Sequence, residues 1–375
     1  MSRHRTRVLF LTKHARTGAS SRYRSFQYLP WLEQAGIECQ VRPLFDEAYL
    51  AHRYQSGRGH VRDILGAFFR RAAALIAARR FDVLVIEKES LPYFPALPER
   101  WLRLLGVPYV VDYDDALFHQ YDQHRSGWVR RLLGSKIAHV IRDAHLVTAG
   151  NAYLADYARC AGAHKVEIVP TVIDLERYPS PNVKPPSDTP FIIGWIGSPS
   201  TAKYLQAIAP ALAEICAGGR GIVRLIGSGP IDLPGVPVEV LPWDEAAEVD
   251  DLKRFDVGIM PLPDEPWERG KCGFKLIQYM ACGLPVVASP VGVNRDIVEQ
   301  GVNGYLAETT AEWARSLSTL LRDAVLRRRM GLAGRQKVEQ HYSLQVTGPR
   351  LAGLIRSVVD GRKAKASRPN IAGNL

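Results

Sequence analysis

The sequence predicts an α/β protein built from two doubly wound, Rossmann-like domains, and three observations predict it. The chain has 375 residues, more than one compact hydrophobic core normally holds. Short apolar runs alternate with amphipathic runs from Arg7 to Pro170, which is typical of a parallel sheet covered by helices. A proline-rich, polar stretch at 171–190 interrupts the alternation, which restarts at Phe191.

The first half supplies strands and helices in strict alternation. Strands are expected at 7–12, 37–44, 81–88, 108–115, 145–150 and 166–170. Helices are expected between them at 25–36, 68–80, 99–106, 128–142 and 151–162. Strand, glycine-bearing loop, helix and strand in this order form the opening of a doubly wound sheet.

The second half repeats this architecture. Strands are expected at 191–197, 221–229, 238–243, 255–262, 284–288 and 304–307. Helices are expected at 201–216, from about 271 to the stop at 283, and at 311–323, 324–342 and 343–362. The domain boundaries follow: an N-terminal domain at 1–175, a linker at 176–190, a C-terminal domain at 191–342, a final helix at 343–362, and a disordered basic tail at 363–375.

Composition excludes several classes of protein. With 46% hydrophobic residues and no apolar run near the roughly 18 residues of a membrane span, no transmembrane helix is expected. Five scattered cysteines without a metal-binding pattern argue against zinc and disulfides and fit a reducing cytoplasm. The net charge of +11 favours an anionic partner, a phosphorylated ligand or an anionic membrane. Nucleic acid is not expected, because no nucleic-acid-binding motif is present.

The most informative stretch runs from Lys271 to Ser289. Apolar residues fall at helical spacing and form one face, namely Leu276, Ile277, Met280 and Ala281. Lys271, Lys275 and Gln278 step along the opposite side. A helix N-terminus carries about half a positive charge, so two lysines there are explained by an anion bound between them. The alternative is a pair of solvated surface lysines.

Three strand-to-helix turns carry cations. The first has Lys13, Arg16, Arg22 and Arg24 around Gly18; the second has Ser198, Ser200 and Lys203; the third has Lys271 and Lys275. In a doubly wound fold such turns lie at one edge of each sheet, so facing sheets would gather them around one cleft. Arginine binds phosphate bidentately and glycine lets the backbone approach, which suits a diphosphate. The alternative is a set of solvated basic loops.

The run from Gly270 to Ala307, GKCGFKLIQYMACGLPVVASPVGVNRDIVEQGVNGYLA, resembles the donor-binding segment of GT-B glycosyltransferases, family 4 in particular. The family's Glu-x7-Glu pair is absent, since Gly270 and Gln278 stand at its positions. The chain is similar to a subset that carries Lys-x-x-x-Lys-Leu-x-Gln-Tyr-Met-Ala. The resemblance implies two Rossmann-like domains facing across a cleft, with the final helix returning to the N-terminal domain.

The resemblance also implies site residues. Ser198 and Lys203 inherit the role of holding the donor's diphosphate, Gly18 matches a glycine loop beside the same phosphates, and Gln278 stands where the family holds the donor ribose. We expect Ser200, Lys271 and Lys275 to bind the donor, and either Arg22 or Arg24 to touch a phosphate of donor or acceptor.

Three carboxylates end an apolar strand at Asp112, Asp114 and Asp115, where they are not core residues because buried isolated charge is costly. One interpretation is a metal-binding DxD. We favour an acceptor-side site in which Asp114 or Asp115 orients or deprotonates the acceptor hydroxyl, because lysines already supply positive charge. His119 is a further candidate for that role, and helix capping is the alternative for the aspartates.

The segment from His52 to Arg80 is basic and partly amphipathic, with Phe68, Phe69, Leu75 and Ile76. Such a helix could lie on an anionic membrane surface. The alternative is a helix whose apolar side faces the core.

The sequence therefore predicts a metal-independent, cofactor-free, retaining glycosyltransferase of the hexosyltransferase type. It would move a sugar from a nucleotide-diphosphate sugar to a glycan or lipid-linked acceptor in polysaccharide or glycolipid assembly. The expected location is the cytoplasm, with peripheral binding to the inner face of the membrane as an option. Alternatives are a sugar-nucleotide epimerase, a non-catalytic nucleotide-sugar-binding protein and an anion-binding scaffold.

Overall fold

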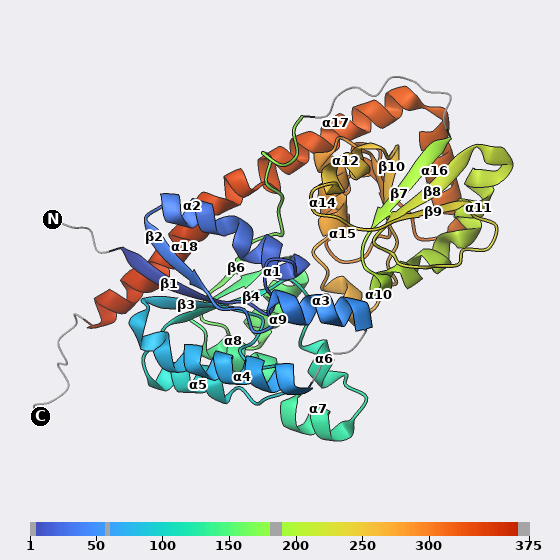
Figure 1. Cartoon of the computed structure of the whole chain (residues 1–375). Coiled ribbons are helices and arrows are strands. Elements are labelled where there is room, and N and C mark those ends of the chain that lie inside the picture. Colours follow the sequence, from blue (N-terminus) through green and yellow to red (C-terminus); the bar gives the residue numbers. More distant parts are fainter. Residues whose placement is uncertain (1–4, 57–60, 181–189, 367–375) are drawn as a thin grey trace, which may run out of the picture. The chain divides into compact units, whose positions relative to one another are not determined.

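A computed structural model describes residues 5–56, 61–180 and 190–366 of the chain. The chain forms two compact units, shown in Figure 1. Unit 1 comprises Met1–Thr171 and Thr347–Leu375, and unit 2 comprises Val172–Val346. The sequence placed these boundaries at 175 and 343. Much of the expected linker, at 181–189, and most of the expected tail, at 367–375, lie outside the described residues.

In its described part, unit 1 contains one six-stranded sheet in the order β2-β1-β3-β4-β5-β6. All the neighbouring strands pair in parallel. The strands are β1 (Thr6–Leu11), β2 (Ile37–Val41), β3 (Val83–Glu87), β4 (Tyr109–Tyr113), β5 (Leu146–Ala149) and β6 (Val166–Ile168). The residues of β3 and β4 are buried throughout, as expected for central strands covered on both faces.

The strand order reverses direction between β1 and β3, because β2 lies on one side of β1 and the later strands lie on the other. Right-handed crossovers therefore place the helices of the β3-to-β6 side on one face and the β1–β2 connection on the other. The helices are α1 (Ala19–Arg24), α2 (Leu29–Gln34), α3 (Glu47–Ser56), α4 (Val61–Ile76), α5 (Leu97–Leu104), α6 (His119–Asp122), α7 (Gly127–Leu133), α8 (Lys136–Asp143) and α9 (Ala152–Cys160).

The last helix, α18 (Leu344–Ala366), joins unit 1 on the α2 side of the sheet (Figure 1). The Tyr28 and Thr347 hydroxyls lie 3.0 Å apart, and Gly348 passes so close to Trp31 that a Cβ would lie 3.0 Å from the indole ring. Farther along, Arg350 pairs with Glu167 at 3.0 Å. The helix extends to Ala366, beyond the end expected at 362.

Unit 2 repeats the design with a parallel sheet in the order β12-β11-β10-β7-β8-β9. The strands are β7 (Phe191–Ile196), β8 (Gly221–Ile226), β9 (Val238–Leu241), β10 (Val257–Met260), β11 (Val286–Ala288) and β12 (Gly304–Leu306). The helices are α10 (Pro199–Ala202), α11 (Ala209–Cys216), α12 (Glu248–Lys253), α13 (Pro266–Arg269), α14 (Phe274–Ala281), α15 (Asn294–Ile297), α16 (Thr310–Arg322) and α17 (Ala324–His341). Helix α14 packs against α17, and α11 packs against α16.

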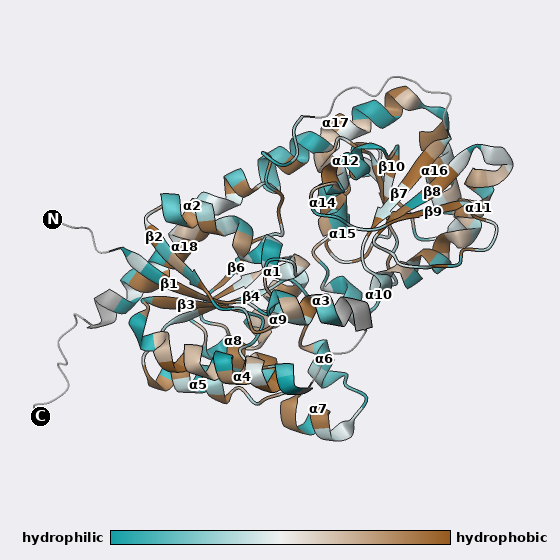
Figure 2. Cartoon of the chain, viewed as in Figure 1, coloured by the Kyte–Doolittle hydropathy of each residue, from teal (hydrophilic) through white to brown (hydrophobic). Residues whose placement is uncertain are grey.

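Hydropathy follows this layering. In Figure 2 the strands are predominantly hydrophobic, and hydrophilic residues concentrate on the helices and loops around them. Apolar residues on the two faces of the unit 2 sheet form two core clusters, one including Tyr279 and Met280 and the other Trp195 and Trp313. Two doubly wound units of this kind confirm the predicted fold class. Within the described residues, no helix combines the length and apolar character needed to span a bilayer.

One expected helix was wrong, and one helix had not been expected. The helix expected at 128–142 is divided into α7 and α8, because Ser135 leaves helical geometry with φ −96° and ψ 3°. Lys136 then turns inward, where its ammonium pairs with Glu89 and donates to the carbonyl of Leu91 at 2.6 Å. Helix α3 had not been expected, and it buries Tyr49 and Leu50.

Candidate functional site

The β7–α10 turn of unit 2 is shaped by Gly197. A Cβ at this position would lie 2.5 Å from the ring of Trp195 and 2.9 Å from Cε of Lys275, so no larger residue fits without displacing them. Lys275 therefore lies over the turn that follows β7, with its Nζ 5.2 Å from the centre of the Trp195 ring. At this distance the indole face stabilises the ammonium group.

This turn lies at the switch point of the unit 2 sheet. The neighbours of β7 are β8 on one side and β10 on the other. The strands β8 and β9, which follow β7, are therefore added on one side of the sheet, and β10 and the strands that follow it are added on the opposite side. Ligands of open α/β sheets bind outside the carboxyl ends of the strands at such a point. Lys275 and the Gly197 turn thus lie at the carboxyl end of β7, where doubly wound sheets bind their ligands.

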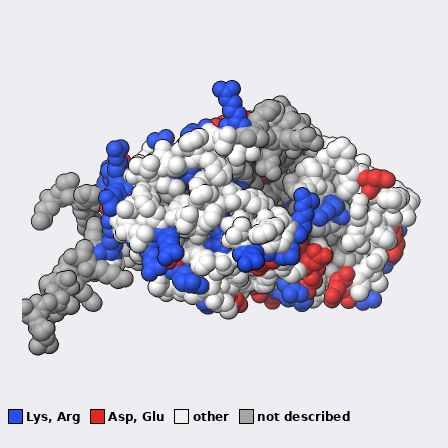
Figure 3. All heavy atoms as spheres, turned by 90° about the horizontal axis from the view of Figure 1, so that it is seen from below, with Lys and Arg blue, Asp and Glu red and all other residues white. Residues whose placement is uncertain are grey.

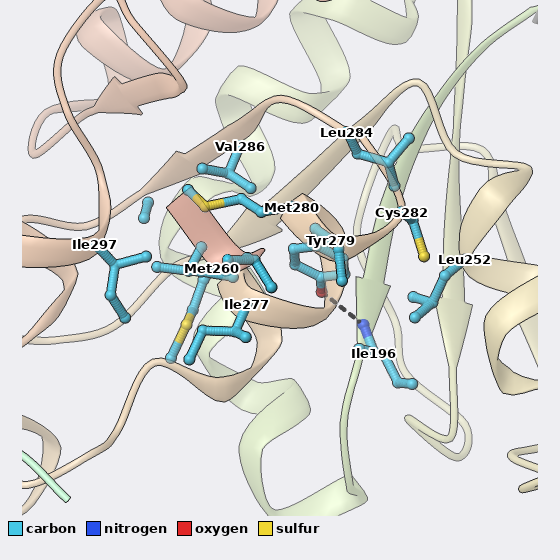
Figure 4. Packing of buried hydrophobic residues seen from close by; sticks show 14 of the residues in the cluster. Ile196, Leu252, Met260, Ile277, Tyr279, Met280, Cys282, Leu284, Val286 and Ile297 are labelled. Atoms are coloured by element: carbon cyan, nitrogen blue, oxygen red, sulfur yellow. Dashed lines mark hydrogen bonds between the residues drawn. The ribbon is translucent and has the colours of Figure 1, made fainter. Parts of the chain in front are cut away.

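Helix α14 holds Lys275 in place through its apolar face. The predicted face residues, Leu276, Ile277, Met280 and Ala281, are all fully buried. Tyr279 is also buried, and its hydroxyl accepts the backbone N–H of Ile196 at 2.9 Å, which ties the helix to the end of β7 (Figure 4). Gly273 precedes the helix with φ +64°, a conformation that glycine adopts without strain.

The segments that carry the second and third basic clusters are linked within unit 2 by one hydrogen bond. Lys203, at the start of the 3₁₀ segment Lys203–Ile208, is exposed, and its Nζ lies 5.4 Å from the centre of the Tyr204 ring. The Tyr204 hydroxyl in turn donates to Glu268 on α13, three residues before Lys271. This bond joins the segment that carries Lys203 to the segment that carries Lys271, which is half-buried.

Two predicted serines lie in the same turn. Ser198 and Ser200 are exposed, and their hydroxyl oxygens are 2.9 Å apart. Both residues are exposed, and a serine hydroxyl can donate to or accept from a ligand at the α10 turn.

Gln278 is placed differently from the expected polar side of the helix. Its side chain is buried, and its amide donates to the hydroxyl of Tyr178 at 3.1 Å. Tyr178 donates to Glu248 at 3.2 Å, and Glu248 also accepts from the indole N–H of Trp243 at 2.7 Å. The side chain of Gln278 is thus part of a buried network, and a role of Gln278 at a ribose stays a prediction.

The switch point of unit 1 carries a cluster of buried charges. Leu11 of β1 is paired with Ile86 of β3, so the residues after β1 and β3 emerge side by side. Lys88 follows β3 and pairs with Asp114 at 2.7 Å and with Asp115 at 3.3 Å. It adopts φ +65°, a strained conformation for a residue with a side chain, and such strain is concentrated at functional sites.

The two charges of the Lys88–Asp114 pair stabilise each other. Burial by itself would raise the pKa of Asp114, but Lys88 and the charge of Arg24 outweigh it and lower the pKa to about 2. Burial would likewise lower the pKa of Lys88, but the carboxylates of Asp114 and Asp115 raise it above its ordinary value. Asp114 is therefore a carboxylate at neutral pH and a weak proton acceptor, whereas the side chain of Asp115 is 29% exposed and more accessible.

Glu87, the last residue of β3, links helix α1 to the loop that follows β1. Glu87 accepts from the Ser21 hydroxyl at 2.6 Å and from the Lys13 backbone N–H at 2.9 Å, and burial raises its pKa. Burial and the charge of Lys88 lower the pKa of Lys13. Gly18 caps this helix at a position where a Cβ would lie 2.4 Å from the side chain of His14.

The two predicted arginines of α1 are both buried. Arg24 forms a two-pronged pair with Asp112, at 2.9 and 2.5 Å, and donates to the carbonyl of Val169 at 2.7 Å. The guanidinium of Arg22 lies 4.8 Å from the centre of the Tyr23 ring. Arg24 thus fixes α1 against the sheet, and phosphate contact by either residue stays a prediction.

His119 lies at the start of α6, and both of its ring nitrogens are engaged. Nδ1 lies 3.0 Å from Asp122 and Nε2 lies 2.9 Å from the Tyr153 hydroxyl. Its ring is held in one orientation, and its role toward an acceptor stays a prediction.

Sequence reasoning missed Lys88 and Glu268. Lys88 had a signal, since the apolar strand VLVIE ends in the charged run EKE. Glu268 is buried, and its Oε2 has no hydrogen-bond partner among the described residues, while Oε1 accepts from Tyr204. It stands two residues before Gly270, where the family pattern would have a carboxylate.

Comparison with known proteins agrees with this architecture. The family model "Glycosyl transferase 4-like domain" matches residues 1–171, and the model "Glycosyl transferases group 1" matches residues 190–323. Together they cover most of both units, and the chain belongs to the GT-B glycosyltransferases of family 4.

Individual relatives are more distant. The chain is 24% identical over 299 residues to the sulfoquinovosyl transferase of Arabidopsis thaliana, covering 72% of this chain and 56% of that protein. It is 34% identical over 150 residues to the N-acetyl-alpha-D-glucosaminyl L-malate synthase of Bacillus anthracis, covering 37% and 38%. The matched part thus spans about half or less of these relatives.

Solved structures match over nearly the whole chain. Sucrose-phosphate synthase from Thermosynechococcus elongatus superposes with a TM-score of 0.68 at 15% identity, covering 95% of this chain and 100% of that chain. Anabaena HepE, in complex with UDP-glucose, superposes with a TM-score of 0.68 at 17% identity, covering 94% and 99%. These likenesses show the fold.

Proposed function

We propose that this chain is a metal-independent, retaining hexosyltransferase that uses a nucleotide-diphosphate sugar as its donor and a hydroxyl of a glycan or lipid-linked acceptor. The observation that carries the proposal is the position of Lys275 over the Gly197 turn, at the switch point of the unit 2 sheet. Lys203 and Lys271 lie on segments joined through Tyr204 and Glu268. A diphosphate at this edge would meet three ammonium groups without a metal ion.

The chemistry follows from the charge that develops. As the bond between the anomeric carbon and the phosphate oxygen breaks, negative charge grows on the leaving diphosphate. Fixed ammonium groups stabilise that charge more in the transition state than in the ground state. The acceptor hydroxyl then bonds to the anomeric carbon on the face from which the diphosphate departs, and its proton passes to the departing diphosphate oxygen.

We further propose that the Lys88 cluster of unit 1 serves the acceptor. Asp115 is the more exposed of the two paired carboxylates, so it is the one that would orient the acceptor hydroxyl. Asp114 would hold Lys88 in position, because its low pKa keeps it ionised and paired. Polysaccharide or glycolipid assembly at the inner face of the membrane would fit the basic charge balance.

Thermal stabilisation of the full chain by a panel of nucleotide sugars tests the donor site. UDP-glucose comes first, since HepE was solved with it. Lys203→Ala and Lys275→Ala should each remove most of the stabilisation, whereas Arg328→Ala, on the exposed side of α17, should retain it. If both lysine variants are stabilised like the parent, the proposed site is wrong.

Release of nucleoside diphosphate separates the enzyme classes. A glycosyltransferase releases it mainly when an acceptor is present, whereas an epimerase converts the sugar without any acceptor. Binding without turnover of any donor would indicate a non-catalytic nucleotide-sugar-binding protein.

A further inference from the structure

Exposed apolar side chains are concentrated on one part of unit 1. Ten of the sixteen exposed large apolar residues in the described chain lie between positions 65 and 132. Phe69 is 76% exposed, Leu104 78% and Trp128 73%. Single exposed apolar residues are ordinary on a protein surface, but a concentration of them marks an interaction site.

These residues are spaced so that each helix presents an apolar stripe to solvent. Helix α4 exposes Leu65, Phe69 and Ile76, helix α5 exposes Leu97, Trp101 and Leu104, and helix α7 exposes Trp128 and Leu132. Residues three, four, seven or eleven positions apart lie on the same side of a helix. The stripes are additional to the faces that pack on the sheet, since Ala67, Leu75 and Leu102 are buried.

The three helices lie on one face of the sheet. The crossovers that lead to β3, β4 and β5 place α4, α5 and α7 opposite α2 and α18, as Figure 1 shows. Figure 2 shows hydrophobic residues on all three helices. We call this surface, defined by Phe69, Ile76, Leu97, Leu104, Trp128 and Leu132, the α4–α5–α7 face.

Positive charge prevails on the α4–α5–α7 face, although two of its arginines are paired with acids, Arg70 with Asp46 at 3.1 Å and Arg103 with Asp143 at 2.6 Å. Each of the three helices carries two exposed arginines: Arg62 and Arg70, Arg100 and Arg103, and Arg130 and Arg131. The acidic residues on these helices are Asp63 and Glu99, of which Asp63 is exposed and Glu99 is buried. In Figure 3, which looks at the molecule from below the view of Figure 1, groups of Lys and Arg over unit 1 stand among uncharged surface.

We propose that the α4–α5–α7 face docks onto an anionic lipid bilayer. Trp, Phe and Leu side chains would enter the boundary between headgroups and acyl chains, and the arginines would bind anionic headgroups. A second copy of the chain fits less well, because a twofold contact would place the arginines of the face against one another. The inference extends the proposed function by supplying a membrane surface for a lipid-linked acceptor, but it rests on the surface residues alone.

Vesicle flotation of the full chain tests the inference, with phosphatidylcholine vesicles alone or mixed with phosphatidylglycerol. The parent should float with the mixed vesicles and much less with phosphatidylcholine alone. The triple variant Phe69→Ser, Leu104→Ser, Trp128→Ser should bind at least tenfold more weakly. The matched control is Val325→Ser with Leu332→Ser, two exposed apolar residues of α17, and it should bind like the parent.

A charge series tests the second half of the proposal. Arg100→Ser and Arg131→Ser should each weaken binding to the mixed vesicles about fivefold, the effect of one basic residue near an anionic surface. The control pair Arg328→Ser and Arg329→Ser, exposed on α17, should have little effect.

Three results would overturn the inference. The first is that the parent stays in the aqueous phase with both kinds of vesicle, and the second is that the triple variant floats like the parent. The third is that the parent is a dimer in size-exclusion chromatography and the triple variant is a monomer, which would make the face a protein interface. Stabilisation by UDP-glucose without vesicles is measured on the same variants, so that failure of the donor site is recorded separately.

Discussion

Replacing Lys88 with Met should change both the stability of unit 1 and the direction of its pH dependence. Methionine has similar length and meets the same backbone strain at φ +65°, so the change isolates the ammonium charge. The side chain of Lys88 is 8% exposed and that of Asp114 is 11% exposed. Removing one partner of a buried ion pair costs about 3–5 kcal/mol, because the other charge stays buried without compensation.

The stability of unit 1 should change with pH in opposite directions in the parent and in the variant. In the parent, the pKa of Asp114 lies at about 2, below its ordinary 3.8, so the carboxylate contributes roughly 2 kcal/mol that is complete above about pH 4 and lost as the pH falls toward 2. Without Lys88, the charge of Arg24 still lowers the pKa of Asp114, but burial is the largest influence on this carboxyl and should raise its pKa above that of the unfolded chain. The variant should therefore lose stability as the pH rises from about 4, where the parent has gained it.

Urea unfolding followed by pulse proteolysis measures this, because the fragments report unit 1 and unit 2 separately. Arg103→Met is the matched control: it removes an ion pair with Asp143 in which the arginine side chain is 65% exposed, so it should cost at most about 1 kcal/mol. A loss of less than about 1 kcal/mol in Lys88→Met, or a pH profile parallel to that of the parent, would refute the reasoning.

Three further changes test other parts of the two sites. Tyr279→Phe removes the buried acceptor of the Ile196 N–H and should cost about 1–3 kcal/mol in urea unfolding of unit 2; a stability equal to that of the parent would contradict the role of this bond. Gly197→Ala crowds Trp195 and Lys275 and should reduce stabilisation by UDP-glucose, whereas Gly353→Ala, with open space around its Cβ, should not. Asp115→Asn should lower transfer to an acceptor about a hundredfold while leaving UDP-glucose stabilisation unchanged, and loss of donor binding instead would count against an acceptor role.

Much of the fold could be predicted because buried parallel strands are nearly continuous apolar runs. Strands β1, β3, β4 and β7 all fall where such runs occur. Helix α3 escaped prediction because its polar and basic residues hide the short apolar pair that it buries. The break at Ser135 escaped because it depends on Lys136 reaching Glu89, which lies 47 positions earlier.

The positions of the candidate site residues were predictable where they depend on local pattern, whereas their roles toward a donor stay predictions. Lys275 follows from helical spacing, and its nearness to Gly197 follows from the strand order of a doubly wound sheet. The Lys88–Asp114 pair depends on the register between β3 and β4, which places Glu87 beside Asp112 and which the sequence does not reveal. The burial of Gln278 depends on Tyr178, which lies 100 positions earlier.

The discontinuous make-up of unit 1 has a practical consequence for dividing the protein. Residues Val172–Val346 form a single contiguous segment and can be expressed as one fragment. The other half cannot be obtained by cutting after Thr171, because α18 supplies Thr347 opposite Tyr28 and the close approach of Gly348 to Trp31. A stable fragment of that half would need α18 rejoined to it, either as a separately added peptide or through a short engineered connection from Thr171 to Thr347.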